Sequence, residues 1–204
     1  MRLRTLRPLL PAMLILSGCT SLQTATTPAT DWDARRASLL QQPNWSLTGR
    51  VAIRTVDGEG GQARLSWTQS GEATQLQLAG PFGAGRVDLS VTPVAVTLQT
   101  GDGQAVRYAG PEAAEQFMDE QLGWSFPVRS ARYWMLGLLD PAAPGERLFD
   151  DAGGLTALRQ HGWDISLNRY ATVDSLLLPT RLTLENPQLR LKTAISNWAI
   201  AELN

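Results

Sequence analysis

The sequence predicts a mainly β (α+β) fold in which about eleven antiparallel strands form a strongly curved, incomplete barrel, with two substantial helices available to cover its apolar face. Segments in which apolar and polar residues alternate recur from Trp45 to Ile200. Turns rich in glycine, aspartate and asparagine separate these segments at short intervals, as in a meander of hairpins. About three short stretches show helical spacing instead. A flattened sandwich of two sheets is the alternative arrangement of the same strands.

The N-terminal residues have the pattern of a secretory signal. Arg2, Arg4 and Arg7 precede an apolar run that ends at Leu16 and is too short to span a bilayer. Ser17 and Gly18 then stand directly before Cys19, the only cysteine of the chain. We interpret residues 1–18 as a signal peptide, residues 19–30 as an N-terminal tether, and residues 31–204 as one domain. A chance cysteine at the end of an ordinary secretory signal is the alternative.

The elements of the domain follow from periodicity and from turn residues. Asp31 is placed to cap a helix that runs to Gln42, where Pro43 stops it. Further helices are expected from Gly110 to Gly123 and from Pro127 to Gly137. Trp198 and Ile200 shift parity relative to the residues before them, which predicts a bulge or a break near Ser196-Asn197. The alternating segments predict strands at 45–54, 63–67, 76–78, 87–91, 94–98, 106–108, 147–149, 155–160, 163–170, 181–185 and 189–195.

Composition excludes several classes of protein. Cleavage before Cys19 removes three of the 18 basic groups and leaves 15 against 19 acidic ones, a net charge near −4. This balance argues against nucleic acid as a partner and against general electrostatic adhesion to anionic lipid. Seven tryptophans accompany a single histidine and a single lysine. The chain therefore offers apolar surface rather than acid–base chemistry.

Catalysis and metal binding are not predicted. His161, the only histidine, lies in an expected turn with Gly162, and the sequence contains no Gly-x-Ser-x-Gly motif. A zinc site needs more nitrogen or sulfur ligands than the chain supplies. We therefore expect a protein that is not an enzyme and that has neither a metal nor a free cofactor.

Several short motifs together resemble the LolB family. Leu16-Ser17-Gly18-Cys19 is similar to a bacterial lipobox, and the resemblance continues through the motifs Gly49-Arg50, Trp67, Gly80-Pro81-Phe82-Gly83, Tyr133-Trp134-Met135-Leu136-Gly137-Leu138 and Ser196-Asn197-Trp198. The resemblance implies an incomplete antiparallel barrel of eleven strands with a short helical lid over an apolar cavity. It implies N-acyl and S-diacylglycerol lipid on Cys19. It also implies an outer-membrane receptor, anchored at the periplasmic face, that accepts lipoproteins from the periplasmic carrier LolA and inserts them into the outer membrane without nucleotide hydrolysis. Thr20, rather than an aspartate, follows the anchor, which is consistent with outer-membrane delivery.

The resemblance also indicates partners and candidate sites. Expected partners are LolA, the acylated N-termini of other lipoproteins and outer-membrane phospholipid, bound by a monomer. Apolar residues that could line a cavity for acyl chains are Trp67, Trp134, Met135, Trp163 and Trp198. For each tryptophan the alternative role is ordinary core packing. Trp134 and Met135, on the presumed lid helix, are the stronger candidates.

The loop Pro81-Phe82-Gly83 is the candidate for membrane insertion. Glycines at positions 80, 83 and 85 leave Phe82 few neighbours to pack against, so we expect an exposed apolar tip. Its burial in lipid would contribute roughly 1.5–3 kcal/mol. The alternative is that Phe82 packs under the rim of the sheet.

Two other functions remain open from the sequence. A lipoprotein of this composition could bind a small hydrophobic ligand in a lipocalin-like calyx. It could also be a structural envelope lipoprotein that docks another protein and holds no ligand.

Overall fold

The computed structural model describes residues 30–81, 85–110, 113, 117, 120 and 126–201. The predicted signal peptide, Cys19 and nearly all of the tether lie outside this range, so their assignments remain predictions. Phe82 and Gly83 also lie outside it, whereas Pro81 lies within it.

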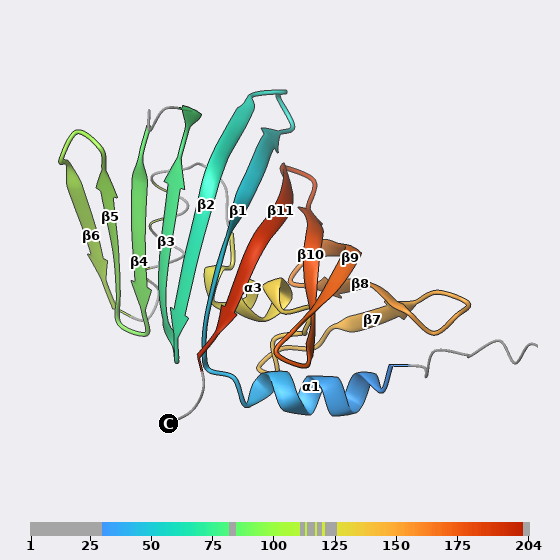
Figure 1. The fold of residues 1–204 in the computed structure, drawn as a ribbon. Coiled ribbons are helices and arrows are strands. Elements are labelled where there is room, and N and C mark those ends of the chain that lie inside the picture. The colour runs from blue at the N-terminus through green and yellow to red at the C-terminus, as the bar shows by residue number, and fades with distance from the viewer. Residues whose placement is uncertain are drawn as a thin grey trace, which may run out of the picture.

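A single antiparallel sheet of 11 strands makes up the body of the protein, in the order β6-β5-β4-β3-β2-β1-β11-β10-β9-β8-β7. The strands are β1 (Asn44–Thr55), β2 (Gly60–Ser70), β3 (Ala73–Ala79), β4 (Val87–Thr92), β5 (Ala95–Thr100), β6 (Ala105–Ala109), β7 (Glu146–Phe149), β8 (Leu155–Gln160), β9 (Trp163–Val173), β10 (Leu176–Glu185) and β11 (Leu189–Ile200). All neighbours are consecutive in sequence except β1 and β11, the first strand and the last. The sheet curves without closing, so β6 and β7 form its two edges (Figure 1). The prediction of an incomplete antiparallel barrel is confirmed.

Two helices are described in full, α1 (Trp32–Leu40) and α3 (Val128–Met135). The Asp31 side chain accepts hydrogen bonds from the backbone N–H groups of Asp33 and Ala34, at 3.1 and 2.9 Å, and so caps α1 as predicted. Helix α3 lies on the concave side of the sheet, and α1 crosses one end of it (Figure 1). Of the third predicted helix, the described residues Ala113, Phe117 and Glu120 have helical backbone.

The predicted bulge occurs where β1 pairs with β11. Thr48 is opposite Asn197 but Gly49 is opposite Ile195, which leaves Ser196 as the extra residue. A Cβ atom on Gly49 would lie 2.3 Å from the carbonyl oxygen of Ala194. Glycine is therefore required at this close approach of the two strands.

The hairpin that joins β9 and β10 is longer than predicted. Strand β10 begins at Leu176 rather than Arg181, and Asp174 and Ser175 form its turn with φ angles of +46° and +67°. The added residues include Pro179, although proline is rare inside strands. The structure accommodates it at an irregularity, since the register shifts between Pro179 and Arg181.

The hydrophobic core fills the concave side of the sheet and includes α3. Leu158, Ile165, Leu178, Ala131 and Trp134 are completely buried there. Because alternate strand residues face this side, the period-two pattern of the sequence determines which side chains enter the core. The core also contains a hollow, described next.

Candidate functional site

An apolar cavity of about 180 Å³ lies between the concave face of the sheet and α3. Strands β1–β5, β10 and β11 form one wall, and Phe117, Phe126 and α3 form the other. The described residues that line it are Val51, Leu65, Trp67, Leu76, Leu78, Val87, Leu89, Leu98, Phe117, Phe126, Val128, Met135, Leu184, Leu191 and Thr193.

The register of the strands brings the lining residues together. Trp67, Leu76, Leu89 and Leu98 are paired in succession from β2 to β5 and therefore form one row across the sheet. Side chains directly opposite each other lie on the same face of a sheet. The row is thus a continuous hydrophobic floor built from four strands.

The cavity presents almost no hydrogen-bonding group. Among the described lining side chains, only the Thr193 hydroxyl and the Trp67 indole N–H are polar. The Trp67 N–H is already used, because it donates to Gln69 Oε1 at 3.1 Å. A ligand here is held by hydrophobic burial and dispersion contacts, which do not depend on direction. Such a site suits hydrocarbon chains of varied length.

The structure places the predicted acyl-cavity residues in two groups. Trp67 and Met135 line the cavity, whereas Trp134, Trp163 and Trp198 are absent from its described lining. Trp134 is fully buried and its indole N–H donates to Gln160 Oε1 at 2.8 Å. Its ring lies 6.2 Å from that of Trp163. These two side chains pack in the core beside the cavity.

Trp198 also packs in the core. Its ring lies 5.4 Å from the ring of Trp45, and its indole N–H donates to the Pro179 carbonyl oxygen at 2.9 Å. The indole thus satisfies a buried backbone carbonyl beside the irregular segment of β10. Sequence periodicity could not separate these core tryptophans from Trp67, because every one of them faces the concave side.

Most of the cavity wall is aliphatic, and the sequence analysis did not single out these residues. Leu76, Leu89, Leu98 and Leu191 each stand at an inward-facing position of a predicted strand. The same alternation that predicted the strands could have identified them once the register was known. The sequence analysis did not predict that β1 pairs with β11, and this pairing brings Leu191 beside the earlier strands.

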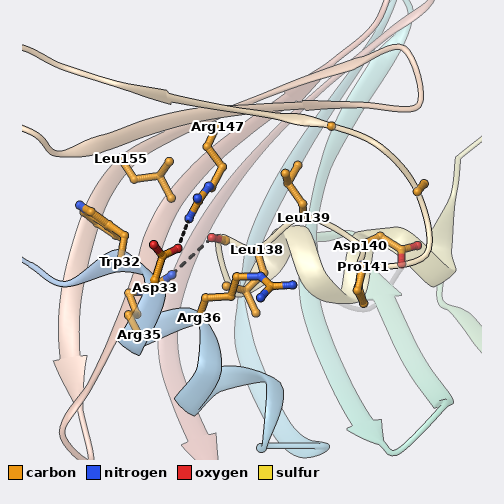
Figure 2. A pocket seen from close by; sticks show the side chains of 13 residues that line it. Trp32, Asp33, Arg35, Arg36, Leu138, Leu139, Asp140, Pro141, Arg147 and Leu155 are labelled. Carbon is orange, nitrogen blue, oxygen red and sulfur yellow. Dashed lines mark hydrogen bonds and ion pairs between the residues drawn. The ribbon is translucent and has the colours of Figure 1, made fainter.

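A second hollow, of about 320 Å³, lies between α1, the segment after α3, and β7 (Figure 2). Across it, Arg147 and Asp33 form an ion pair at 2.9 Å. Buried Arg35 donates hydrogen bonds to the carbonyl oxygens of Leu136, Gly137 and Leu177, at 2.6, 3.3 and 2.7 Å. Arg35 therefore binds the C-terminal end of α3 and joins it to β10.

The charge of Arg35 is unusual for a buried position. Burial lowers the pKa of Arg35 to about 10, so the guanidinium is still charged at neutral pH. It lies 5.4 Å from the Trp32 ring centroid and 5.7 Å from that of Tyr170. These aromatic faces and the three carbonyl oxygens stabilise the cation in place of a carboxylate. The sequence analysis did not identify Arg35 as a structural residue.

The structure offers no arrangement that points to metal binding in its described part. No group of three or more histidine, cysteine, aspartate or glutamate side chains is placed there to hold a metal ion. His161 is exposed in its turn, with a φ angle of +53°. Among the described residues, no helix has both the length and the apolar character that a membrane span requires.

Comparisons with known proteins agree with this architecture. A family model described as outer membrane lipoprotein LolB matches residues 43–198. A protein from Chromohalobacter salexigens named outer-membrane lipoprotein LolB is 36% identical over 190 residues, which cover 91% of this chain and 86% of that protein. One of the same name from Nitrosococcus oceani is 33% identical over 196 residues, which cover 94% and 96%.

A solved structure supports the fold independently of sequence. The LolA superfamily protein from Nitrosomonas europaea superposes with a TM-score of 0.51 at 8% identity, and the match covers 80% of this chain and 88% of that one. Fold and cavity together define the class of this protein, that of open, curved β-sheets that enclose an apolar interior. Within that class, the chain belongs to the LolB family.

Proposed function

We propose that the protein is an outer-membrane receptor that accepts lipoproteins from the periplasmic carrier LolA and inserts them into the outer membrane. The apolar cavity is the observation that carries the proposal, since acyl chains are the part of a lipoprotein that it can bind. The names of its relatives, outer-membrane lipoprotein LolB, supply the location and the class of cargo. The geometry favours a binding protein that acts without nucleotide hydrolysis.

The cavity must enlarge to hold its cargo. Its volume of about 180 Å³ is below the roughly 300–1,000 Å³ that is typical of small-molecule sites. Each methylene buried in the enlarged cavity contributes about 0.8 kcal/mol. We therefore propose that acyl chains displace the inner wall on entry, so that transfer runs toward the partner with the greater affinity.

The anchor and the loop complete the mechanism. Cys19 carries the N-acyl and S-diacylglycerol lipids that hold the receptor at the periplasmic face, because several chains together bind a bilayer stably. Pro81, Phe82 and Gly83 then form a tip that enters the bilayer at release. Pro81 is exposed and lies two residues after Ala79, the end of β3, which supports a position for the tip beyond the ends of the strands.

A two-stage transfer assay with Phe82 variants tests the proposal. Carrier-to-receptor transfer and receptor-to-liposome transfer of a labelled lipoprotein are scored separately for wild type, Phe82→Leu and Phe82→Glu. We expect all three to accept cargo, because the proposal gives residue 82 a part only in the release step. Phe82→Glu should fail at delivery, since a carboxylate enters the acyl region only at a large cost in hydration, whereas Phe82→Leu should keep most delivery.

Two outcomes would contradict parts of this proposal. Wild-type delivery by Phe82→Glu, or its failure already at acceptance, would remove the insertion role of the loop. Failure of the wild-type receptor to take any acylated cargo from the carrier would remove the receptor function itself.

A further inference from the structure

The outer face of the sheet brings arginines into direct opposition. Arg50 on β1 is paired with Arg64 on β2, and Arg54 on β1 with Arg190 on β11. A third such pair lies on β9 and β10, where Arg169 is opposite Arg181. Like charges directly opposite on neighbouring strands reduce the stability of a sheet. Three such pairs on one face indicate a function other than stability.

We call this surface the basic face; it consists of Arg50, Arg54, Arg64, Arg169, Arg181, Arg190 and Lys192, all of them exposed. Of these, only Arg190 forms an ion pair within the described part of the chain, with Glu185. The face holds seven of the 18 basic residues of a chain whose net charge is −1. The net charge of the whole chain argued against adhesion to anionic lipid. The strand register nevertheless brings these basic residues together on one face, which the net charge does not indicate.

The basic face adjoins the loop proposed to enter the membrane. Arg64 is opposite Ala79, the last residue of β3, and a hollow of about 270 Å³ is lined by Arg50, Arg64 and Pro81 among others. Another hollow on this face, of about 450 Å³, is lined by Arg54, Arg190 and Lys192 together with residues of the β1–β2 hairpin. Both hollows have Gln62 and arginine side chains in their lining, so they adjoin each other on the basic face and offer cationic groups to anions of headgroup size.

Apolar surface accompanies the charge at this end of the sheet. Val56, in the turn between β1 and β2, is 72% exposed. Its N–H donates to the carbonyl oxygen of Gln188 at 2.9 Å, so the β1–β2 and β10–β11 turns lie side by side. Figure 1 shows these turns at the same end of the sheet as the C-terminal end of β3. Asp57 and Glu59 lie in the same turn as Val56 and offset only part of the positive charge.

We propose that the basic face binds the anionic phospholipid headgroups of the membrane into which the loop at Pro81 inserts. Guanidinium groups pair with phosphate through two parallel hydrogen bonds, and the bound anions relieve the repulsion between the opposed arginines. Cationic side chains next to exposed apolar tips are the combination that holds proteins at lipid interfaces. This inference rests on the proposed function and names the lipid chemistry that the delivery step uses.

An environment-sensitive fluorophore on the intact, acylated protein tests the inference. The label is attached to Gln188→Cys, whose side chain lies at this end of the sheet, and the protein is anchored in vesicles of phosphatidylcholine with or without phosphatidylglycerol. We expect the emission to shift to the blue only with phosphatidylglycerol, and salt to reverse the shift. Arg50→Gln/Arg64→Gln should reduce the ratio of anchored protein with its basic face bound to anchored protein with that face unbound by about 30-fold, at about 1 kcal/mol per arginine near an anionic surface.

Two controls separate the possible results. Arg36→Gln/Arg107→Gln removes the same charge from exposed positions elsewhere and should keep the wild-type shift. Transfer from the carrier, measured in the same variants, should be normal, because Arg50 and Arg64 do not line the apolar cavity. Failure of the wild-type protein to take cargo from the carrier would contradict the proposed function. It would not contradict binding of the basic face to lipid, which the fluorescence shift measures separately.

Three outcomes would overturn the inference. The first is an equal shift in both lipid mixtures. The second is an equal loss of the shift in the control variant. The third is an absent lipid response together with a loss of carrier transfer in Arg50→Gln/Arg64→Gln, which would assign the basic face to an acidic protein partner.

Discussion

Trp134 and Met135 are adjacent in α3, yet their side chains meet different surroundings. Successive side chains on a helix project about 100° apart, so Met135 lines the cavity while Trp134 packs against β8 and β9. A core position and a cavity position therefore respond differently to substitution.

Replacement of Trp134 by alanine should destabilise the fold by about 3–5 kcal/mol, the usual cost of truncating a buried tryptophan. Met135→Leu, which keeps the volume of the side chain, should cost less than about 1.5 kcal/mol and should retain acyl binding. Thermal unfolding measures the first effect, and uptake of a fluorescent fatty acid measures the second. A Trp134→Ala protein with wild-type stability and impaired uptake would place Trp134 in the cavity after all.

Gly49 and Gly61 provide a matched pair of positions in the central strands. Gly49→Ala should destabilise by about 1–3 kcal/mol or more, because its Cβ would lie 2.3 Å from the Ala194 oxygen and 2.9 Å from Ile195 Cα. Gly61→Ala meets nothing within 4 Å and should change stability by no more than about 0.5 kcal/mol. Chemical denaturation of both variants checks this, and equal stabilities would disprove the requirement for glycine at the bulge.

Helix α3 is fixed at its C-terminal end by two polar side chains. Gln160 accepts from the Trp134 indole N–H and the Asp140 backbone N–H, at 2.8 and 2.9 Å, and donates to the carbonyl oxygens of Asp140 and Ala143. Arg35 binds the carbonyl oxygens that follow the helix. Movement of this end of α3 to enlarge the cavity would therefore break several buried hydrogen bonds.

Gln160→Leu should destabilise the fold by at least about 2 kcal/mol, because it leaves buried donors and carbonyl oxygens without partners. Gln99→Leu, at an exposed strand position, is the control and should be nearly neutral. Denaturant midpoints of the two variants decide the matter. If Gln160→Leu is as stable as Gln99→Leu, the hydrogen bonds of Gln160 do not fix the helix.

The elements were predictable wherever local sequence determines them. Alternation located most strands, Asp31 located the start of α1, and a change of parity located the bulge at Ser196. Long-range contacts were not predictable in this way. The burial of Arg35 depends on carbonyl oxygens about 100 residues away in sequence, and the choice between core and cavity for each tryptophan depends on how α3 packs.

At the scale of the whole molecule, the strand that links the two halves of the sheet is the last strand in the sequence. Strand β11 pairs with β1 and β10 and supplies Leu191 and Thr193 to the cavity. Removal of residues 189–204 should therefore prevent cooperative folding, because it separates the strands β1–β6 from β7–β10. Removal of residues 202–204 alone is the control and should preserve a sharp thermal transition. A cooperative transition in the longer truncation would show that the two groups of strands fold independently.

The pairing of the first strand with the last also affects how the protein is made. A chain that is exported N-terminus first presents β1 long before β11. Trp45, Leu47 and Val51 on β1 therefore stay uncovered on one side until export of the chain ends. Contacts between such distant segments form slowly, and uncovered apolar strands aggregate. We therefore expect the newly exported receptor to depend on periplasmic chaperones during this interval, and its yield to fall when export outpaces their supply.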